Sequence, residues 1–262
     1  MKKGYALVTG ASSGIGAEIA KILAQKGYSL LIIARRAERL EALRTAILAI
    51  HDVDVVVLAQ DLAVPLAGKI LFDAVQQGGY SVEILVNNAG FGIQGKFLEM
   101  EMKDVEQMFR LNMSTLTALT QLFAQEMVAK GNGYILQVAS AVAFLPSPYV
   151  SAYAATKAYV LSFSESLRYE LKDTGVSITT LYPGITTTEF NAVADAKTPA
   201  MMNMSILSAE KVAQIGIKAM FQRRRARIPG FINNMSAFFA KIIPRSWIIN
   251  SAGSLMKKAN QQ

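Results

Sequence analysis

Short apolar runs alternate with amphipathic segments through most of the chain, and this alternation limits the possible folds more than any other feature. Residues 5–10 (YALVTG) and 28–34 (YSLLIIA) have the length and apolar character of buried strands, and apolar residues at helical spacing follow each run. Strands and helices in alternation predict βαβ units and a parallel sheet that helices cover on both faces. The sequence therefore predicts an α/β fold.

The same pattern predicts further elements up to residue 230. Strands are expected at 53–62, 82–90, 133–140 and 176–184, with a short final strand at 225–230. Helices are expected at 14–27, 36–50, 65–77, 102–129 with a bend near Leu111, 153–173 and 208–222. No repeat, low-complexity block or linker divides the chain, so we expect a single domain spanning residues 1–262.

Residues 231–262 are expected to be a helical extension of that domain. Lys241, Pro244 and Arg245 interrupt an apolar stretch, a pattern that fits two short amphipathic helices. Such helices could form a lid on the core, a subunit interface or a membrane-surface foot, and packing within the protein or an oligomer is the favoured interpretation. The apolar residues are Phe238, Phe239, Ile242, Ile243, Trp247, Ile248, Ile249 and Leu255.

The residue types that the chain lacks exclude several kinds of chemistry. It has no cysteine and one histidine, His51, which the pattern places at a helix-to-strand junction. Disulfides, thiolate catalysis and zinc–thiolate sites are therefore excluded, and we expect no metal site. Any reaction must use hydroxyls, amines, amides, carboxylates or a cofactor.

Composition and charge narrow the cellular setting. Hydrophobic residues make up 52% of the chain, yet no apolar run approaches the roughly 18 residues of a membrane helix, which favours a soluble cytoplasmic protein. The net charge of +8 is locally dense in residues 223–227 (RRRAR). These arginines could bind nucleic acid, but a solvated helix end or an anion-binding surface explains them better, so we expect no nucleic-acid partner.

A glycine-rich turn, TGASSGIG, joins the first expected strand to the first expected helix. Glycines let the backbone approach a pyrophosphate closely, and free N–H groups at a helix start attract its charge. A purely structural turn is the alternative, but the position at the first strand-to-helix crossing favours a dinucleotide site. The candidate contacts are Gly10, Ser12, Ser13, Gly14, Ile15 and Gly16.

The end of the second expected strand indicates which dinucleotide binds. Arg35 and Arg36 stand where an NAD site usually offers a carboxylate to the ribose 2′-hydroxyl. Guanidinium groups form charge-assisted bonds with the 2′-phosphate of NADP, whereas a carboxylate would repel it. The sequence therefore favours NADP(H), with ordinary helix-starting arginines as the alternative.

Tyr153 and Lys157 are four residues apart in an expected helix, so their side chains share a face. They could be a structural pair or a proton-transfer device. Hydride transfer to a carbonyl needs an acid that protonates the oxygen, and a phenol can supply that proton. An ammonium about 4 Å away would favour the phenolate by roughly 4 kcal/mol at an effective dielectric near 20, so we expect Lys157 to lower the pKa of Tyr153.

Seven short motifs, in this order, resemble the short-chain dehydrogenase/reductase superfamily over nearly the whole chain. The resemblance implies a Rossmann-type, doubly wound parallel sheet of about seven strands and a nicotinamide cofactor. Within the superfamily the chain looks most like the broad bacterial group of NADP-dependent reductases. The motifs are Thr9–Gly16, Asp61 in QDL, Asn87–Gly90, Asn112 in RLNMS, Ser140 in QVASAVA, Tyr153 with Lys157, and Tyr182–Gly184.

The resemblance also implies catalytic roles. Tyr153 would be the acid, and the Ser140 hydroxyl would share the charge that develops on the carbonyl oxygen. Lys157 would assist Tyr153 and hold the nicotinamide ribose. The bent-helix backbone at Asn112 would help to hold water beside the lysine.

Other matched residues are implied to lie along the cofactor. Those expected at the adenine are Asp61 and Leu62. Those expected at the adenosine ribose, or serving the sheet alone, are Asn87, Asn88, Ala89 and Gly90. Those expected at the nicotinamide are Pro183, Gly184, Ile185 and Thr187 or Thr188.

Apolar residues at the expected substrate side favour an apolar ketone, aldehyde or alcohol, although core packing explains the methionines equally well. We expect an NADP(H)-dependent oxidoreductase that transfers a hydride between nicotinamide and a carbonyl or secondary alcohol. A non-catalytic NADP-binding redox sensor or interaction protein is the alternative. The resemblance suggests a homodimer or homotetramer through helices 113–129 and 153–171. The apolar residues are Phe144, Leu145, Tyr149, Met201, Met202 and Met204.

Overall fold

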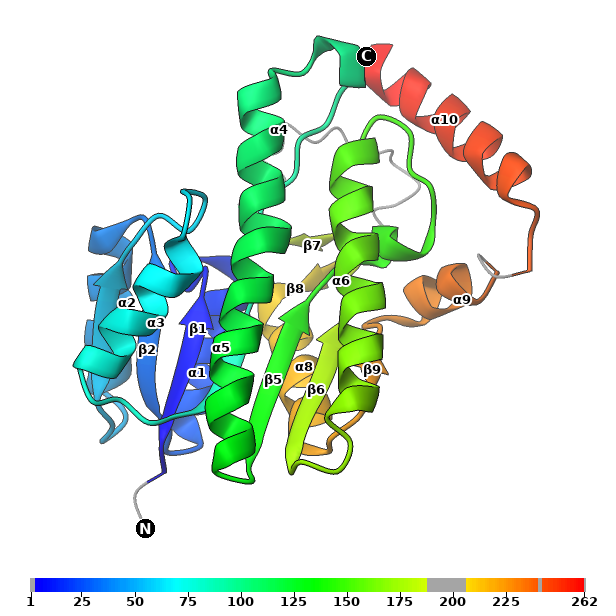
Figure 1. Ribbon diagram of the computed structural model, residues 1–262. Helices are drawn as coiled ribbons and strands as arrows, with labels where there is room; N and C mark the ends of the chain where they lie inside the picture. Colours follow the sequence, from blue (N-terminus) through cyan, green and yellow to red (C-terminus); the bar gives the residue numbers. More distant parts are fainter. Residues whose placement is uncertain (1–2, 188–205, 240–241, 262) are drawn as a thin grey trace.

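Seven parallel strands form one sheet in the order β3-β2-β1-β4-β5-β6-β9 (Figure 1). The computed structural model describes residues 3–187, 206–239 and 242–261. The order reverses between β1 and β4, as in a doubly wound Rossmann-type sheet. The predicted α/β fold is therefore confirmed. The strands are β1 (Tyr5–Thr9), β2 (Ser29–Ala34), β3 (Val55–Ala59), β4 (Val82–Asn87), β5 (Gly133–Val138), β6 (Val176–Leu181) and β9 (Ala226–Arg227).

Helices cover both faces of the sheet. One face packs against α1 (Gly14–Gln25), α2 (Ala37–Leu48) and α8 (Ala209–Phe221). The other packs against α3 (Ala67–Gln77), α5 (Leu116–Ala129) and the C-terminal half of α6 (Ser151–Glu170). Figure 1 shows α5 and α6 in front of the sheet, with α1 and α8 behind it.

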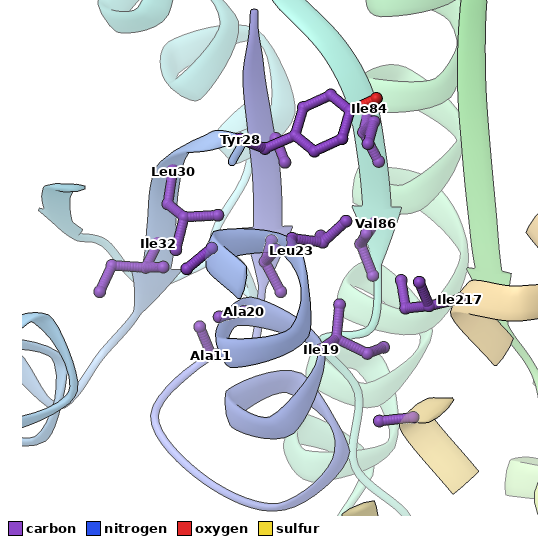
Figure 2. Close-up of a cluster of buried hydrophobic side chains, with 14 of the residues drawn as sticks. Ala11, Ile19, Ala20, Leu23, Tyr28, Leu30, Ile32, Ile84, Val86 and Ile217 are labelled. Carbon is purple, nitrogen blue, oxygen red and sulfur yellow. The ribbon is translucent and has the colours of Figure 1, made fainter. Parts of the chain in front are cut away.

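Successive residues of the central strands enter different cores, which explains why the runs are apolar at every position. In β2, Leu30 and Ile32 join the cluster under α1 and α8, whereas Leu31 and Ile33 join the cluster under α3 and α5. Figure 2 shows the first cluster, in which Leu23 of α1 lies among strand side chains. Burial on both faces is what fixes these segments as central strands.

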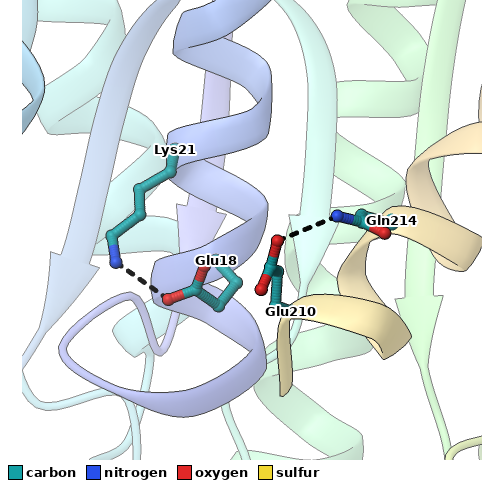
Figure 3. Close-up of polar contacts among 4 residues, drawn as sticks. All are labelled: Glu18, Lys21, Glu210 and Gln214. Atoms are coloured by element: carbon teal, nitrogen blue, oxygen red, sulfur yellow. Dashed lines mark hydrogen bonds and ion pairs between the residues drawn. The ribbon is translucent and has the colours of Figure 1, made fainter. Parts of the chain in front are cut away.

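Polar contacts on the outer helix surfaces add little to this packing. In Figure 3, Lys21 of α1 reaches Glu18 at 2.8 Å, and Gln214 of α8 reaches Glu210 at 3.0 Å. Exposed contacts at this spacing contribute about 0.2 to 0.5 kcal/mol each. The apolar layers therefore dominate the stability of the sheet.

The expected long helix is interrupted where the bend was predicted. It consists of α4 (Met102–Phe109), a π-helical turn η2 (Arg110–Thr115) and α5. Three shorter features were not predicted from the sequence. They are the turns η1 (Phe97–Glu99) and η3 (Ala141–Phe144) and a small parallel pair, β7 (Thr186–Thr187) with β8 (Leu207–Ser208).

Several expected strands end earlier in the structure, because their last residues form turns at the sheet edge. Residues 60–62 follow β3, and residues 88–90 follow β4. Thr9, the last residue of β1, explains the turn after β4. Its buried hydroxyl donates to the Val86 carbonyl at 3.1 Å and accepts from the N–H groups of Asn88 and Ala89, both at 3.0 Å. One side chain thus joins the ends of β1 and β4.

The chain ends in two helices, α9 (Phe231–Phe239) and α10 (Arg245–Gln261), as predicted. Their large apolar side chains are mostly exposed, so these side chains do not pack against the described part of this single chain. The other part of the favoured interpretation, packing within an oligomer, stays a prediction. No helix of the described residues has the length and apolar character needed to cross a membrane.

The arginine-rich segment has structural partners. Arg223 donates to the Gly175 carbonyl at 2.8 Å and lies over the ring of Tyr134, 5.0 Å from its centroid. Arg225 lies 3.8 Å from Glu165. These contacts tie Arg223 to the amino-terminal end of the sheet and place Arg225 beside α6. The expectation of no nucleic-acid partner stays a prediction.

Replacing Thr9 by valine should lower the free energy of unfolding by about 3 kcal/mol, because three backbone groups would lose a buried partner while the shape is kept. Urea denaturation measures this change. The matched control is Thr45→Val, which removes a hydroxyl bonded to Glu41 on the exposed side of α2, and it should change the free energy by less than about 1 kcal/mol. Equal losses in the two variants would contradict the role given to Thr9.

Candidate active site

The candidate residues follow the carboxyl ends of different strands. Because the strands are parallel, these ends meet at one edge of the sheet, beside the point where the strand order reverses. The edge brings together the turns after β1, β2, β3 and β4 with the residues that follow β5 and β6. Within the described residues, no group of three or more acidic or histidine side chains could hold a metal ion there or elsewhere.

The glycine turn packs directly against the turn after β4. Gly10 and Gly14 have φ values of 68° and 56°, which favour glycine. A Cβ on Gly16 would collide with the Gly10 carbonyl and the Asn88 amide. Asn88 in turn donates to the carbonyls of Thr9 and Gly10 at 3.0 and 3.2 Å. The side chain of Asn88 therefore shapes the turn, and Asn87 likewise bonds within the core, to Thr120 at 2.9 Å.

Arg36 reaches from the end of β2 to the start of α1. Its Nη2 atom lies 3.1 Å from the Ser12 hydroxyl and 3.0 Å from the Ser13 hydroxyl. Ser13 is the residue before α1, and its side chain does not cap the helix. A guanidinium, two hydroxyls and helix-start N–H groups thus meet at one point, a donor set suited to phosphate. Arg35 is exposed beside them, and Ile15 is half-buried in the first turn of α1.

Asp61 and Leu62 form the turn after β3. The Asp61 carboxylate accepts from the Ala63 N–H at 2.8 Å, and the carbonyl of buried Leu62 accepts from the Thr115 hydroxyl at 2.8 Å. Thr115 belongs to η2. The turn predicted to lie at the adenine is therefore fixed to the π-helical turn.

Asn112 in η2 connects three segments of the site. Its buried amide donates to the Phe91 carbonyl at 2.9 Å and to the Thr156 hydroxyl at 3.1 Å, and its oxygen accepts from the Phe91 N–H at 3.2 Å. A Cβ on Gly90 would lie 3.0 Å from the Asn112 oxygen and 3.4 Å from the Lys157 nitrogen. Asn112 therefore positions the segment after β4 against α6.

Lys157 is a buried cation, with its side chain on α6 and only 4% of its surface exposed. Its ammonium donates to the Val138 carbonyl at the end of β5, at 3.0 Å. The nitrogen lies 5.7 Å from the centroid of the Tyr153 ring. Burial lowers the pKa of Lys157 to about 8.

Ser140 and Tyr153 are brought together from different elements. Ser140 precedes η3, where its hydroxyl accepts from the Val142 N–H at 3.4 Å. Its hydroxyl also forms a hydrogen bond with the phenol of Tyr153 on α6. The four residues predicted to be catalytic, Asn112, Ser140, Tyr153 and Lys157, thus form one connected group.

The expected effect of Lys157 on Tyr153 is not what the structure shows. Burial raises the pKa of the Tyr153 phenol above its usual value, and the hydrogen bond from Ser140 opposes that rise in part. The expectation from the sequence counted the attraction between the Lys157 ammonium and the Tyr153 phenolate. It did not count the free-energy cost of burying the charged form of each group. At neutral pH the phenol is therefore protonated and able to give up a proton.

The segment after β6 lies partly outside the described residues. Pro183 is buried, Gly184 and Ile185 are half-buried, and Thr187 is exposed in β7. A Cβ on Gly184 would collide with the side chain of Asn233 on α9, which donates to the Pro229 carbonyl at 2.8 Å. Thr188, Met201, Met202 and Met204 lie outside the described residues.

Several residues that shape the site were not predicted to do so. Thr156 accepts from Asn112 and donates to the Tyr153 carbonyl at 2.7 Å, and its place between Tyr153 and Lys157 was a usable signal. The Val138 carbonyl and the backbone groups of Phe91 form hydrogen bonds through main-chain atoms. No side-chain pattern in the sequence indicates such contacts. Asn233 lies far along the chain from the loop it contacts.

A match to the family of short chain dehydrogenases extends over residues 4–199. The chain belongs to that family. A short chain dehydrogenase of Pseudocercospora fijiensis is 34% identical over 227 residues, covering 86% of this chain and 72% of that protein. A very-long-chain 3-oxoacyl-CoA reductase of Danio rerio is 31% identical over 196 residues, covering 72% of this chain and 61% of that protein.

Solved structures of the family have the same fold. A short-chain dehydrogenase from Sphingobium yanoikuyae, in complex with NADPH, is 29% identical with a TM-score of 0.82 and covers 95% of this chain and 96% of that one. The bulky-bulky ketone specific alcohol dehydrogenase from Comamonas testosteroni is 28% identical with a TM-score of 0.78, and the match covers 87% of each chain. As a short-chain dehydrogenase, the chain is an oxidoreductase built on a nucleotide-binding fold.

The buried Lys157 predicts a pH dependence of stability. Its pKa falls from 10.5 in the unfolded chain to about 8 in the folded chain, so between these values the unfolded chain binds the extra proton and stability rises with pH. From pH 8 to roughly 9.5, the free energy of unfolding should rise by about 1.5 kcal/mol relative to Lys157→Met. Urea denaturation across this range measures the difference. The same substitution at exposed Lys172 should leave the wild-type slope intact, and an unchanged slope in Lys157→Met would contradict the assignment.

Proposed function

We propose that the chain is an NADP(H)-dependent oxidoreductase that transfers a hydride between nicotinamide and a carbonyl or secondary alcohol. The substrate that fits best is an apolar ketone or aldehyde. The observation that carries this proposal is the hydrogen-bonded hydroxyl pair of Ser140 and Tyr153, with the buried Lys157 ammonium beside it. The pair lies at the same sheet edge as the glycine turn.

The donor set at the start of α1 fits the phosphates of the cofactor. The N–H groups of the first turn and the hydroxyls of Ser12 and Ser13 would hold the pyrophosphate. Arg36, already directed toward both serines, would bind the ribose 2′-phosphate together with exposed Arg35. When bound, the nicotinamide supplies or accepts the hydride.

The side chains around Tyr153 supply the proton chemistry. The Tyr153 phenol donates its proton to the carbonyl oxygen, and Ser140 donates a hydrogen bond to the same oxygen. The negative charge then left on the phenolic oxygen is stabilised by the Lys157 ammonium. With a pKa of about 8, Lys157 is mostly charged at neutral pH. Burial keeps Tyr153 protonated, which favours the direction of carbonyl reduction.

A 3-oxoacyl thioester is a second candidate substrate. Very-long-chain 3-oxoacyl-CoA reductases recur among the curated relatives, including one from Rattus norvegicus that is 28% identical over 251 residues, covering 93% of this chain and 76% of that protein. Such a substrate combines a ketone with an apolar chain and an anionic carrier, and the net charge of +8 favours the carrier. The two candidates differ in whether the carrier improves turnover.

NADPH oxidation should therefore be measured with apolar ketones, apolar aldehydes and 3-oxoacyl thioesters of matched chain length. Turnover of any of them supports an oxidoreductase, and a higher kcat/KM for the thioesters would select the second candidate. NADPH binding without turnover of any carbonyl would contradict the proposal and favour a redox sensor. The result of this test does not depend on where in the cell the chain is located or on whether it forms an oligomer.

Tyr153→Phe should reduce kcat at least about a hundredfold, because the acid is removed while the ring remains. The dissociation constant for NADPH, measured by fluorescence titration, should change less than about threefold, since the hydroxyl contributes little to ground-state binding. A matched control is Tyr159→Phe, which removes an exposed hydroxyl on the same helix that bonds to Thr117. Undiminished turnover in Tyr153→Phe would remove Tyr153 from its role.

Arg36→Ala should weaken NADPH binding by about ten- to a hundredfold, because a charge-assisted bond to the 2′-phosphate is lost. Binding of NADH, which lacks that phosphate, should change little, so the ratio of the two dissociation constants reports the contact. Arg44→Ala, an exposed arginine of α2 paired with Glu41, is the control. An equal loss for both cofactors would show that Arg36 only supports the turn.

A further inference from the structure

Helix α9 packs with its small and polar side inward. Ala237 is 6% exposed, and Asn233 is buried against the loop after β6. The large apolar side chains point the other way, and Phe231 is 79% exposed. A helix that packs only against its own protein has the opposite arrangement. The outward apolar side chains are Phe231, Ile232, Met235, Phe238 and Phe239.

The chain beyond α9 continues this apolar surface. Ile242 and Ile243 are exposed between the helices, and Trp247 at the start of α10 is 70% exposed. None of the described side chains of residues 242–257 is buried. Gly253 lies beside Pro148, and Figure 1 shows α10 standing away from the sheet. The two helices thus present a large apolar area to solvent, far more than scattered surface residues would.

The charge of this segment selects among possible partners. Residues 231–262 contain four of the chain's 27 basic residues and none of its 19 acidic ones. Arg245 and Lys257 are exposed on α10, and Lys241 and Lys258 are the other two. Helices that lie on anionic bilayers typically combine exposed aromatic and aliphatic side chains with basic residues and few acidic ones.

We propose that α9 and α10 dock on the surface of an anionic phospholipid bilayer. The apolar side chains would enter the boundary between headgroups and acyl chains, and Trp247 would lie at the headgroup level. The basic side chains would bind lipid phosphates. A two-fold contact with a second copy is less favourable, because it would face two wholly basic segments without any acid to pair with them. The docked helices would lie beside the active site, since α9 contacts η3, which follows Ser140.

Flotation of the full chain with vesicles tests the proposal. The chain should bind phosphatidylcholine vesicles that contain about 30% phosphatidylglycerol at least about tenfold more tightly than pure phosphatidylcholine vesicles. Raising the salt from about 0.1 M to about 0.5 M should weaken this binding severalfold, because the Debye length shortens. Wild-type chain that does not bind the anionic vesicles, or that binds both kinds equally at both salt concentrations, would overturn the proposal.

Two sets of substitutions separate this surface from general stickiness. The combined variant Phe231→Ser, Phe238→Ser and Trp247→Ser should lose at least about tenfold in affinity for anionic vesicles. The control Ile50→Ser, Ile70→Ser and Tyr169→Ser, which removes exposed apolar side chains elsewhere, should bind like wild type. Loss of binding in the control alone would contradict the proposal.

A charge variant provides a measurement that does not depend on the apolar substitutions. Arg245→Gln with Lys257→Gln should weaken binding to anionic vesicles about tenfold and leave thermal unfolding unchanged. Light scattering without vesicles tests the second occupant. A dimer that dissociates in the serine variant, in a protein that does not bind vesicles, would assign the surface to a second copy.

Discussion

The hydroxyl of Thr9 holds two strand ends at one place, and the geometry of the sheet edge depends on that contact. It satisfies three backbone groups of the β4 end at once, and Asn88 returns two bonds to the β1 end. Glycine at position 16 then lets α1 start directly against this joint. Asn112 does the same on the other side, where it connects η2 to Phe91 and Thr156. The turns and the helix that carry the predicted site residues are thus positioned mainly by hydrogen bonds between side chains and the backbone.

Burial controls the chemistry of the two central groups in opposite ways. It penalises the charged form of each, so the pKa of the Tyr153 phenol rises while that of the Lys157 amine falls. The amine keeps a partner in the Val138 carbonyl, which is neutral and cannot offset the loss of water in full. A protonated phenol beside an ammonium is suited to giving a proton to a carbonyl oxygen, because the positive charge then stabilises the resulting phenolate.

Much of the fold and the site could be predicted from the sequence, because the information is local. Buried strands are apolar at every position, and motifs such as TGASSGIG place their residues at strand ends whatever the rest of the chain does. The pKa of Tyr153 could not be predicted, since it depends on the burial of two groups that only tertiary packing determines. The outward face of α9 was also missed: spacing shows that Phe231, Met235 and Phe238 share a side, but it does not show which side packs. Residues 188–205 lie outside the described structure, so the expectations for the substrate loop stay predictions.

The contact between Gly184 and Asn233 gives α9 a second role, which is to support the loop after β6. Asn233 lies on the inner side of the helix, so close to the loop after β6 that a Cβ at position 184 would collide with its side chain. Its bond to the Pro229 carbonyl fixes it in place. Through this side chain, α9 supports a loop at the carboxyl edge of the sheet. A chain cut after Gly230 would keep every residue predicted to be catalytic and still lose the support of that loop.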